Sequence, residues 1–177
     1  MHLNGLAYLD LSNNKISGDI PNWIWEMWNC YSLNLSHNML TGMELNSYVF
    51  PFSNALHVFD LKSNRLQGQI PMPGSAAFLL DYSNNMFSSL LPNFTIYLSS
   101  TQFLKLSNNN ISGHLPRSIC DSPLEILDLP HNNFSRLLPP CLMENVYLRI
   151  LSFEGESIRR DACQRFMVGT ATRGYPE

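Results

Sequence analysis

The chain has 177 residues, 45% of them hydrophobic and 14% charged, and its formal net charge is −3. This length and hydrophobic content are typical of one folded domain with a sizeable core, which excludes a disordered chain as the default. A nucleic-acid or anionic-membrane partner would favour a basic patch, so the slightly acidic balance argues against both.

The two ends of the chain differ in composition. The N-terminal sequence MHLNGLAYLDL lacks a basic stretch followed by an apolar one, so we expect no secretory leader in this chain. No apolar run approaches the ~20 residues of a membrane span, so no span is expected. Residues 157–177 carry 4 Lys or Arg against 2 Asp or Glu, whereas residues 1–156 carry 7 against 12.

Six near-copies of one motif fill most of the chain, and the first is LDLSNNKISGDIP at residues 9–21. Aligned on the last Asn of the polar centre, the copies follow one another in steps of 24, 26, 21, 24 and 23 residues. The aligned residues are Asn14, Asn38, Asn64, Asn85, Asn109 and Asn132. This period is that of leucine-rich repeats, in which each coil contributes a short strand and a helical or 3-10 segment.

The apolar residues of each copy keep a fixed distance from this Asn. Two of them stand five and three residues before it, and their period-2 spacing predicts a strand with one buried face. The pairs are Leu9/Leu11, Leu33/Leu35, Phe59/Leu61, Leu80/Tyr82, Leu104/Leu106 and Leu127/Leu129. The Asn has no apolar role, so we interpret the six as a structural Asn ladder whose amides satisfy backbone groups in the turn. A catalytic role is not expected, because all six copies would need it.

Glycine and proline mark the second half of each copy. Gly recurs four residues after the Asn, where it predicts a turn with positive φ or a close approach of neighbouring coils. The residues at this position are Gly18, Gly42, Gly68 and Gly113, with Ser89 and Arg136 as exceptions. In five copies an apolar-Pro pair follows, which predicts a short helical segment on the outer side, because Pro fits the first turn of a helix.

We therefore predict an α/β solenoid over residues 1–153. It should be a curved stack of about six leucine-rich coils, with short parallel strands on the concave side and 3-10 or short helical segments on the convex side. A seventh coil starts with Leu148, Leu151 and Phe153, but position 156, where the ladder Asn should stand, is Glu. Residues 154–177 are predicted to be an irregular tail outside the repeat, and one hypothesis for it is a truncated or frame-shifted gene product.

The copies resemble the plant-type leucine-rich repeat, LxxLxLxxNxLxGxIP, over residues 9–139. The stretches PNWIWEM, LNLSHNML, LDYSNNMFSSLLPNF, and SIC followed by PPCL are similar to the ectodomains of plant cell-surface receptor-like proteins of the Cf and Ve disease-resistance type. The resemblance implies an extracellular horseshoe at the plasma membrane that binds a protein, peptide or glycan ligand in defence signalling and works through partner receptor kinases. The chain departs from that family in lacking its signal peptide and its Cys-bearing N-terminal cap.

The strand residues that flank the buried pairs should point to the concave face, where solenoids usually bind partners. Four Asp in one column of that face would receive a basic ligand patch, and the neighbouring apolar column, if exposed, would mark an interaction surface. The predicted ligand-binding residues are Tyr8, Asp10, Asp60, Lys62, Asp81, Phe103, Lys105 and Asp128. The alternative is an ordinary solvated strand face.

Four Asn-x-Ser/Thr sequons occur, about as many as the composition gives by chance. We expect glycans on them if the chain is secreted, and the four residues are Asn34, Asn93, Asn110 and Asn133. Asn34 lies in the predicted concave column, so the other three are the better acceptors.

The four Cys residues are not equivalent. Cys120 and Cys141 fall on the outer side of adjacent coils, so a disulfide between them is one expectation and two free thiols the other. Cys30 occupies a position that Leu fills in other coils and is predicted to be a buried thiol. Cys163, in the tail, has no obvious partner.

The sequence contains no motif for catalysis or for cofactor binding. There is no Gly-x-Ser-x-Gly, phosphate loop or dinucleotide fingerprint, and the five His show no metal-ligand spacing. We therefore expect no enzyme activity, no cofactor and no metal. Trp23, Trp25 and Trp28 form either an aromatic box or, as we prefer, a convex turn packed on the first coils. The alternative functions are a secreted enzyme inhibitor of the polygalacturonase-inhibitor kind and a non-functional fragment.

Overall fold

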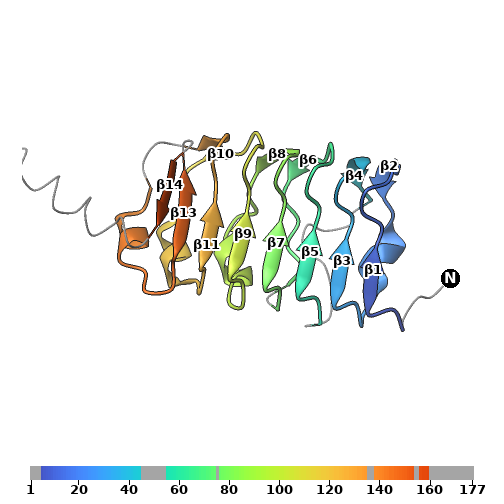
Figure 1. Ribbon diagram of the computed structural model, residues 1–177, viewed down its shortest axis with the longest axis horizontal. Coiled ribbons are helices and arrows are strands. Elements are labelled where there is room, and N and C mark those ends of the chain that lie inside the picture. The colour runs from blue at the N-terminus through green and yellow to red at the C-terminus, as the bar shows by residue number, and fades with distance from the viewer. Residues whose placement is uncertain (1–4, 45–54, 75, 135–137, 154–155, 160–177) are drawn as a thin grey trace, which may run out of the picture.

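The computed structural model describes residues 5–44, 55–74, 76–134, 138–153 and 156–159. Its main element is an eight-stranded sheet whose first seven strands are parallel and come from successive coils in chain order (Figure 1). These are β1 (Tyr8–Asp10), β3 (Ser32–Asn34), β5 (Val58–Asp60), β7 (Leu79–Asp81), β9 (Phe103–Lys105), β11 (Ile126–Asp128) and β13 (Ile150–Phe153). The predicted leucine-rich solenoid is confirmed, with seven stacked parallel strands.

The strands stack in register, so that equivalent residues of successive coils lie side by side. The middle residue of each strand lies opposite the middle residue of the next, as in Leu33 opposite Phe59. These inward-facing side chains are buried in every coil from β3 onward. One face of the sheet therefore lines the core, and the other is the open, concave face.

The last strand, β14 (Glu156–Arg159), corrects the prediction of an irregular segment at these residues. It pairs antiparallel with β13, so it runs opposite to the repeat. An open sheet edge leaves N–H and C=O groups unpaired, and a returning chain can satisfy them. The rest of the predicted tail, including Cys163, and the turn residue Arg136 lie outside the described residues.

Three two-stranded parallel sheets, which the repeat did not predict, follow the turns after the main strands. In them β2 (Ser17–Ile20) pairs with β4 (Met39–Met43), β6 (Gln67–Gln69) with β8 (Met86–Ser89), and β10 (Ser112–Gly113) with β12 (Asn133–Phe134). The Gly that recurs four residues after the ladder Asn lies in these small strands, and two different constraints favour Gly there. Gly18 has a φ of 86°, which favours Gly over other residues. At Gly42, a Cβ would lie 2.5 Å from Oδ1 of Asp19 in the preceding coil.

Four 3-10 helices cover the side opposite the open sheet face (Figure 1). They are η1 (Asn22–Glu26), η2 (Phe94–Tyr97), η3 (Arg117–Asp121) and η4 (Pro140–Met143). Pro21 and Pro116 stand at the start of η1 and η3 in extended conformation, as the apolar-Pro pairs predict. In the Trp cluster only Trp25 is buried, so the interpretation as a convex turn packed on the core holds.

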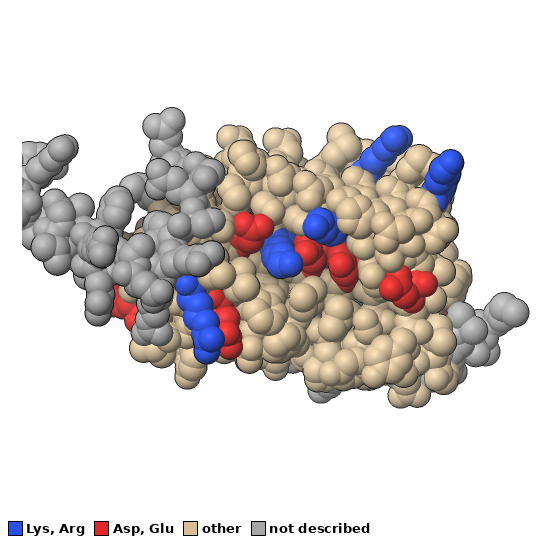
Figure 2. Space-filling model, in the orientation of Figure 1, with Lys and Arg blue, Asp and Glu red and all other residues tan. Residues whose placement is uncertain are grey.

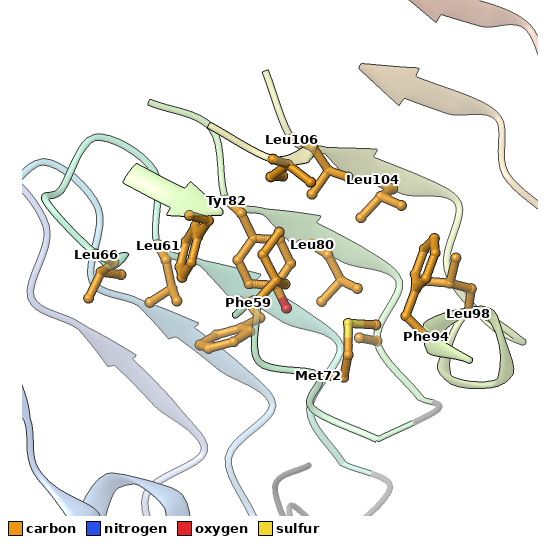
Figure 3. Close-up of a cluster of buried hydrophobic side chains, with 14 of the residues drawn as sticks. Phe59, Leu61, Leu66, Met72, Leu80, Tyr82, Phe94, Leu98, Leu104 and Leu106 are labelled. Carbon is orange, nitrogen blue, oxygen red and sulfur yellow. The ribbon is translucent and has the colours of Figure 1, made fainter. Parts of the chain in front are cut away.

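Aromatic side chains join the cores of neighbouring coils. Trp25, Phe59, Tyr82 and Phe87 form a chain of edge-to-face contacts, with ring centroids 6.4, 5.8 and 5.9 Å apart. Such contacts add to the stabilisation from burial alone. Tyr82 stands where other coils have Leu, among the buried hydrophobic side chains of the core (Figure 3). Its hydroxyl donates a hydrogen bond to the carbonyl of Pro71. Burial raises the pKa of Tyr82 well above its ordinary value.

Replacing Tyr82 by Phe should lower the free energy of unfolding by about 1–2 kcal/mol, because the Pro71 carbonyl loses its donor inside the core. Urea unfolding followed by circular dichroism would measure the change. Tyr147→Phe is the matched control, since Tyr147 is exposed and should be nearly neutral. Equal midpoints for the two variants would contradict the role given to the Tyr82 hydroxyl.

Candidate ligand-binding face

Five of the six ladder Asn residues link successive coils through their side-chain amides. Nδ2 of Asn85 donates to the carbonyl of Leu61 in the preceding coil (2.9 Å), and Oδ1 accepts the N–H of Leu66 (3.1 Å). Asn38, Asn64, Asn109 and Asn132 repeat this pattern, whereas Asn14, in the first coil, donates to carbonyls of its own coil. Because each of the five linking amides donates and accepts at once, these side chains belong to the frame and are not free for a ligand.

The residue before each ladder Asn has a left-handed backbone, with φ between 55° and 58°. These residues are Asn13, His37, Ser63, Asn84, Asn108 and His131. Among residues other than Gly, Asn and His adopt this conformation more readily than most. The Asn-Asn pairs of the repeat are thus explained, and the two His residues occupy a structural turn.

A central row of polar side chains crosses the open face of the main sheet. It comprises Asp10, Asn34, Asp60, Asp81, Lys105 and Asp128, each opposite the next in the strand register. Figure 2 shows acidic and basic side chains close together across the middle of this face. The strand register therefore aligns five of the six charged residues predicted for the concave face, and the sixth, Lys62, follows the end of β5 outside this row.

Most of the hydrogen-bonding capacity of the central row is used within the protein. In the first four coils Oδ1 accepts the N–H of the residue two positions ahead, at 2.8 to 3.1 Å, which closes a turn after the strand. At Asp128 this bond is impossible, because residue 130 is Pro, and Oδ2 instead accepts the hydroxyl of Ser107 at 2.6 Å. The row is therefore partly a structural device.

The second carboxylate oxygen is engaged in Asp10 and Asp81, whereas in Asp60 and Asp128 it has no donor among the described residues. Oδ2 of Asp10 accepts Asn34 Nδ2 at 3.3 Å, and Oδ2 of Asp81 lies 3.3 Å from Nζ of Lys105. Asp81 is also only 4% exposed, so this predicted ligand contact is largely out of reach. Within the described part of the chain, Oδ2 of Asp60 has no hydrogen-bond donor.

The environments of Asp10 and Asp60 shift their pKa values in opposite directions. The backbone N–H of Ser12 holds the pKa of Asp10 below its ordinary value. Burial raises the pKa of Asp60, and the neighbouring carboxylate of Asp81 adds to the increase, while the backbone N–H of Lys62 and the charges of Lys62 and Lys105 act against it. Asp60 is therefore a partly desolvated carboxylate that lacks a full set of partners.

An aromatic shelf runs along the strand starts of the same sheet, and we define it as Tyr8, Tyr31, His57, Phe78 and Phe103. The rings of Tyr8 and Tyr31 are 5.7 Å apart, those of Tyr31 and His57 stack at 4.4 Å, and those of Phe78 and Phe103 meet edge to face at 4.9 Å. Tyr8, Tyr31 and Phe78 are 67%, 42% and 36% exposed. Such exposed, clustered aromatic rings are typical of binding surfaces.

Sequence reasoning found only Tyr8 and Phe103 of this shelf. The other three residues, Tyr31, His57 and Phe78, each stand seven residues before a ladder Asn, one position before the strand begins. Comparing that column across coils would have found them. The remaining residues of the predicted apolar column, Val58, Leu79 and Ile126, are half-buried.

The sequons fall into two groups. The amide of Asn34 is engaged, because it donates to Asp10 and its oxygen accepts the N–H of Ser36. Asn93, Asn110 and Asn133 are exposed. Asn93 precedes η2 on the convex side, and the other two follow the ladder Asn near the ends of the strands. All three are therefore away from the strand starts that carry the aromatic shelf.

The cysteines of the described residues lie in two different environments. Cys120 in η3 and Cys141 in η4 form a disulfide, with their Cα atoms 5.9 Å apart, which ties two adjacent coils together on the convex side. Cys30 is buried, and burial raises the pKa of its thiol. Neither group lies on the open face of the sheet.

The described segments contain no group of three His, Cys, Asp or Glu side chains placed to hold a metal ion. None of the helices in these segments is long and apolar enough to cross a membrane.

Asn85→Asp should lower the free energy of unfolding at neutral pH by at least about 2 kcal/mol, because a carboxylate cannot donate to the two carbonyls that the amide satisfies. Burial would raise the pKa of the new carboxyl group, so the loss should be smaller at pH 4 than at pH 7. The control is Asn108→Asp in the exposed turn. Equal losses for both variants, measured by urea unfolding, would contradict the role of the ladder.

Asp60→Asn should not destabilise the fold, because Asn34 closes the equivalent turn with an amide. Since the folded-state pKa of Asp60 is raised, the charged form disfavours folding, and the wild-type protein loses stability as pH rises through that pKa. The variant should therefore be more stable above this range by about 0.5 kcal/mol or less, as solvent screens part of the effect. It should show no gain near pH 3. Thermal unfolding of the variant and the wild type across pH would measure the difference in stability. A lower stability of Asp60→Asn at neutral pH would contradict the raised pKa of Asp60.

Known proteins resemble this chain in repeat, in fold and in sequence. The family model of the Leucine Rich Repeat matches residues 5–27, 100–122 and 123–145. Receptor-like protein 7 of Arabidopsis thaliana is 42% identical over 111 residues, which are 63% of this chain and 11% of that protein. Receptor-like protein 35 of Arabidopsis thaliana is 36% identical over 162 residues, which are 86% of this chain and 17% of that protein. The chain thus spans less than a fifth of these relatives.

A solved structure gives the same result for the fold. The Arabidopsis receptor kinase HAESA, in complex with the peptide hormone IDA and the co-receptor SERK1, matches with a TM-score of 0.72 and 27% identity. The match covers 87% of this chain and 26% of that one. With its in-register Asn ladder, its parallel sheet and these relatives, the chain belongs to the plant leucine-rich-repeat receptor-like proteins, as a stretch of their repeat region.

Proposed function

We propose that this chain is a ligand-binding section of the ectodomain of a plant cell-surface receptor-like protein in defence signalling, and that it binds an extracellular peptide across the open face of its main sheet. The observation that carries the proposal is the juxtaposition, on that one face, of exposed aromatic rings and an incompletely paired carboxylate. The chain binds its ligand without catalysing a reaction. HAESA, with a similar fold, holds a peptide hormone and a co-receptor, which supports a peptide ligand and a partner receptor kinase for the whole protein.

Other features support an extracellular place for this section. A disulfide between Cys120 and Cys141 persists in an oxidising compartment and is rare in the cytosol. Asn93, Asn110 and Asn133 are exposed, whereas a glycan on Asn34 would be attached to the nitrogen that donates a hydrogen bond to Asp10. We therefore propose the first three as the glycosylated residues, and the open face of the sheet as the surface left uncovered.

The test is a selection of a displayed random-peptide library on the chain secreted from eukaryotic cells, followed by a steric block. Ser32 lies on the open face between Tyr8 and Val58 in the register, and Ser17 is exposed in the small strand β2. In a Cys163→Ser background, polyethylene glycol maleimide on Ser32→Cys should weaken the enriched peptides at least tenfold by calorimetry. The same polymer on Ser17→Cys should leave binding within about twofold.

The unlabelled Ser32→Cys protein separates the polymer from the substitution, and the buried Cys30 is shielded from the reagent. Equal weakening by the polymer at both positions, or no enriched peptide at all, would refute the proposed function.

A further inference from the structure

The aromatic shelf has the extent of a short peptide. It runs from Tyr8 in the first described coil to Phe103 in the fifth, and neighbouring strands lie ~4.8 Å apart, so it spans about 19 Å. An extended chain advances ~3.3 Å per residue, so about six residues cover this length. Alternate side chains of an extended chain point the same way, so about three of them would face the shelf.

The rings of the aromatic shelf have exposed surface that the packing of the coils leaves available for a ligand. The buried aromatic residues Phe59 and Tyr82 already hold the coils together, whereas Tyr8 and Tyr31 stay largely in solvent. Tyr side chains bury a large area at a low cost in conformational entropy, which makes them frequent centres of binding energy. Apolar side chains are therefore the part of a ligand that the shelf fits.

Asp60 supplies the charge preference. Its turn does not require a carboxylate, because Asn34 closes the same turn with an amide. Its second oxygen has no donor among the described residues, whereas the second oxygens of Asp10 and Asp81 are engaged. A half-buried carboxylate beside a second carboxylate is stabilised by a cation and destabilised by an anion.

The basic residues of this face do not reverse that preference. Lys105 is held at 3.3 Å by Asp81, which leaves less of its charge for a ligand. Over the central row and Lys62, the four residues Asp10, Asp60, Asp81 and Asp128 outnumber the two Lys. A ligand that crosses this row thus meets a net negative face, in which Asp60 keeps one oxygen without a donor among the described residues.

We propose that the ligand of this face is an extended peptide segment that lays aromatic or long aliphatic side chains on the aromatic shelf and sets a Lys or Arg against Asp60. This inference rests on the proposed function and adds the chemical class of the peptide. It also divides the roles on the face: the shelf supplies affinity, Asp60 selects a basic residue, and Asp10, Asn34 and Asp81 keep their turns.

The experiment uses the same displayed random-peptide library, sequenced after selection on the wild-type chain. The enriched peptides should combine aromatic or aliphatic residues with at least one Lys or Arg, and acidic peptides should be depleted. Tyr31→Ala should weaken their binding at least tenfold by calorimetry, with Tyr147→Ala, at an exposed Tyr outside the shelf, as its control. Asp60→Asn should weaken peptides that carry Lys or Arg about tenfold, with the exposed Asp121→Asn as its control.

The outcomes separate the two proposals. If the polymer on Ser32→Cys blocks binding but the enriched peptides are acidic, or bind Tyr31→Ala and Asp60→Asn as well as the wild type, the peptide class is wrong and the proposed function stands. If the polymer has no effect, both fall. Peptides without a basic residue that still depend on Tyr31 would overturn the role of Asp60. Both variants change solvent-exposed or turn-compatible positions, and their melting curves show whether each is folded.

Discussion

The side-chain amide of the ladder Asn is the interaction on which the rest of this structure depends. Each strand ends at a turn whose carbonyl and N–H groups point into the protein, where water cannot satisfy them. One amide group both donates and accepts, so Asn85 satisfies its own coil and the preceding coil together. Repetition of this bond fixes the register of the coils, and the register in turn aligns Asp60 with Asp81 and Asp81 with Lys105. The open face is thus a consequence of the frame beneath it.

That frame also decides which residues are free to vary. The buried strand residues are held by packing, the ladder by its amides, and the residues before it by their left-handed backbone. The central row is held less tightly, since an Asp or an Asn closes the same turn, as Asp60 and Asn34 demonstrate. The aromatic shelf is held least, because Tyr8 and Tyr31 contact mainly each other and His57. Change at the shelf alters recognition with little effect on folding.

The sequence predicts those parts of this structure that repeat. Asn38 and Leu33 have equivalents at fixed distances in every coil, so period and spacing predict the ladder and the buried strand face. The small sheets depend on pairing between β2 and β4 across coils, which no local pattern carries. The strand β14 pairs with the edge of the sheet at β13. Its sequence lies outside the repeat, so the repeat does not predict this strand. What is shared by all coils is predictable, and what depends on one neighbour is not.

The candidate site shows the same limit at the level of single residues. Alternation along a strand predicts that Tyr8 and Asp10 face outward, and both do, but it stops where the strand stops. Tyr31 and Phe78 stand one position before the strand, where the chain has not yet adopted the alternating geometry, so alternation cannot assign them a face. Asp81 obeys the alternation and is still buried, because the adjacent Lys105 and Ser83 close over its carboxylate. Orientation follows from the repeat, whereas accessibility depends on the neighbouring side chains, and accessibility decides which residues a ligand can reach.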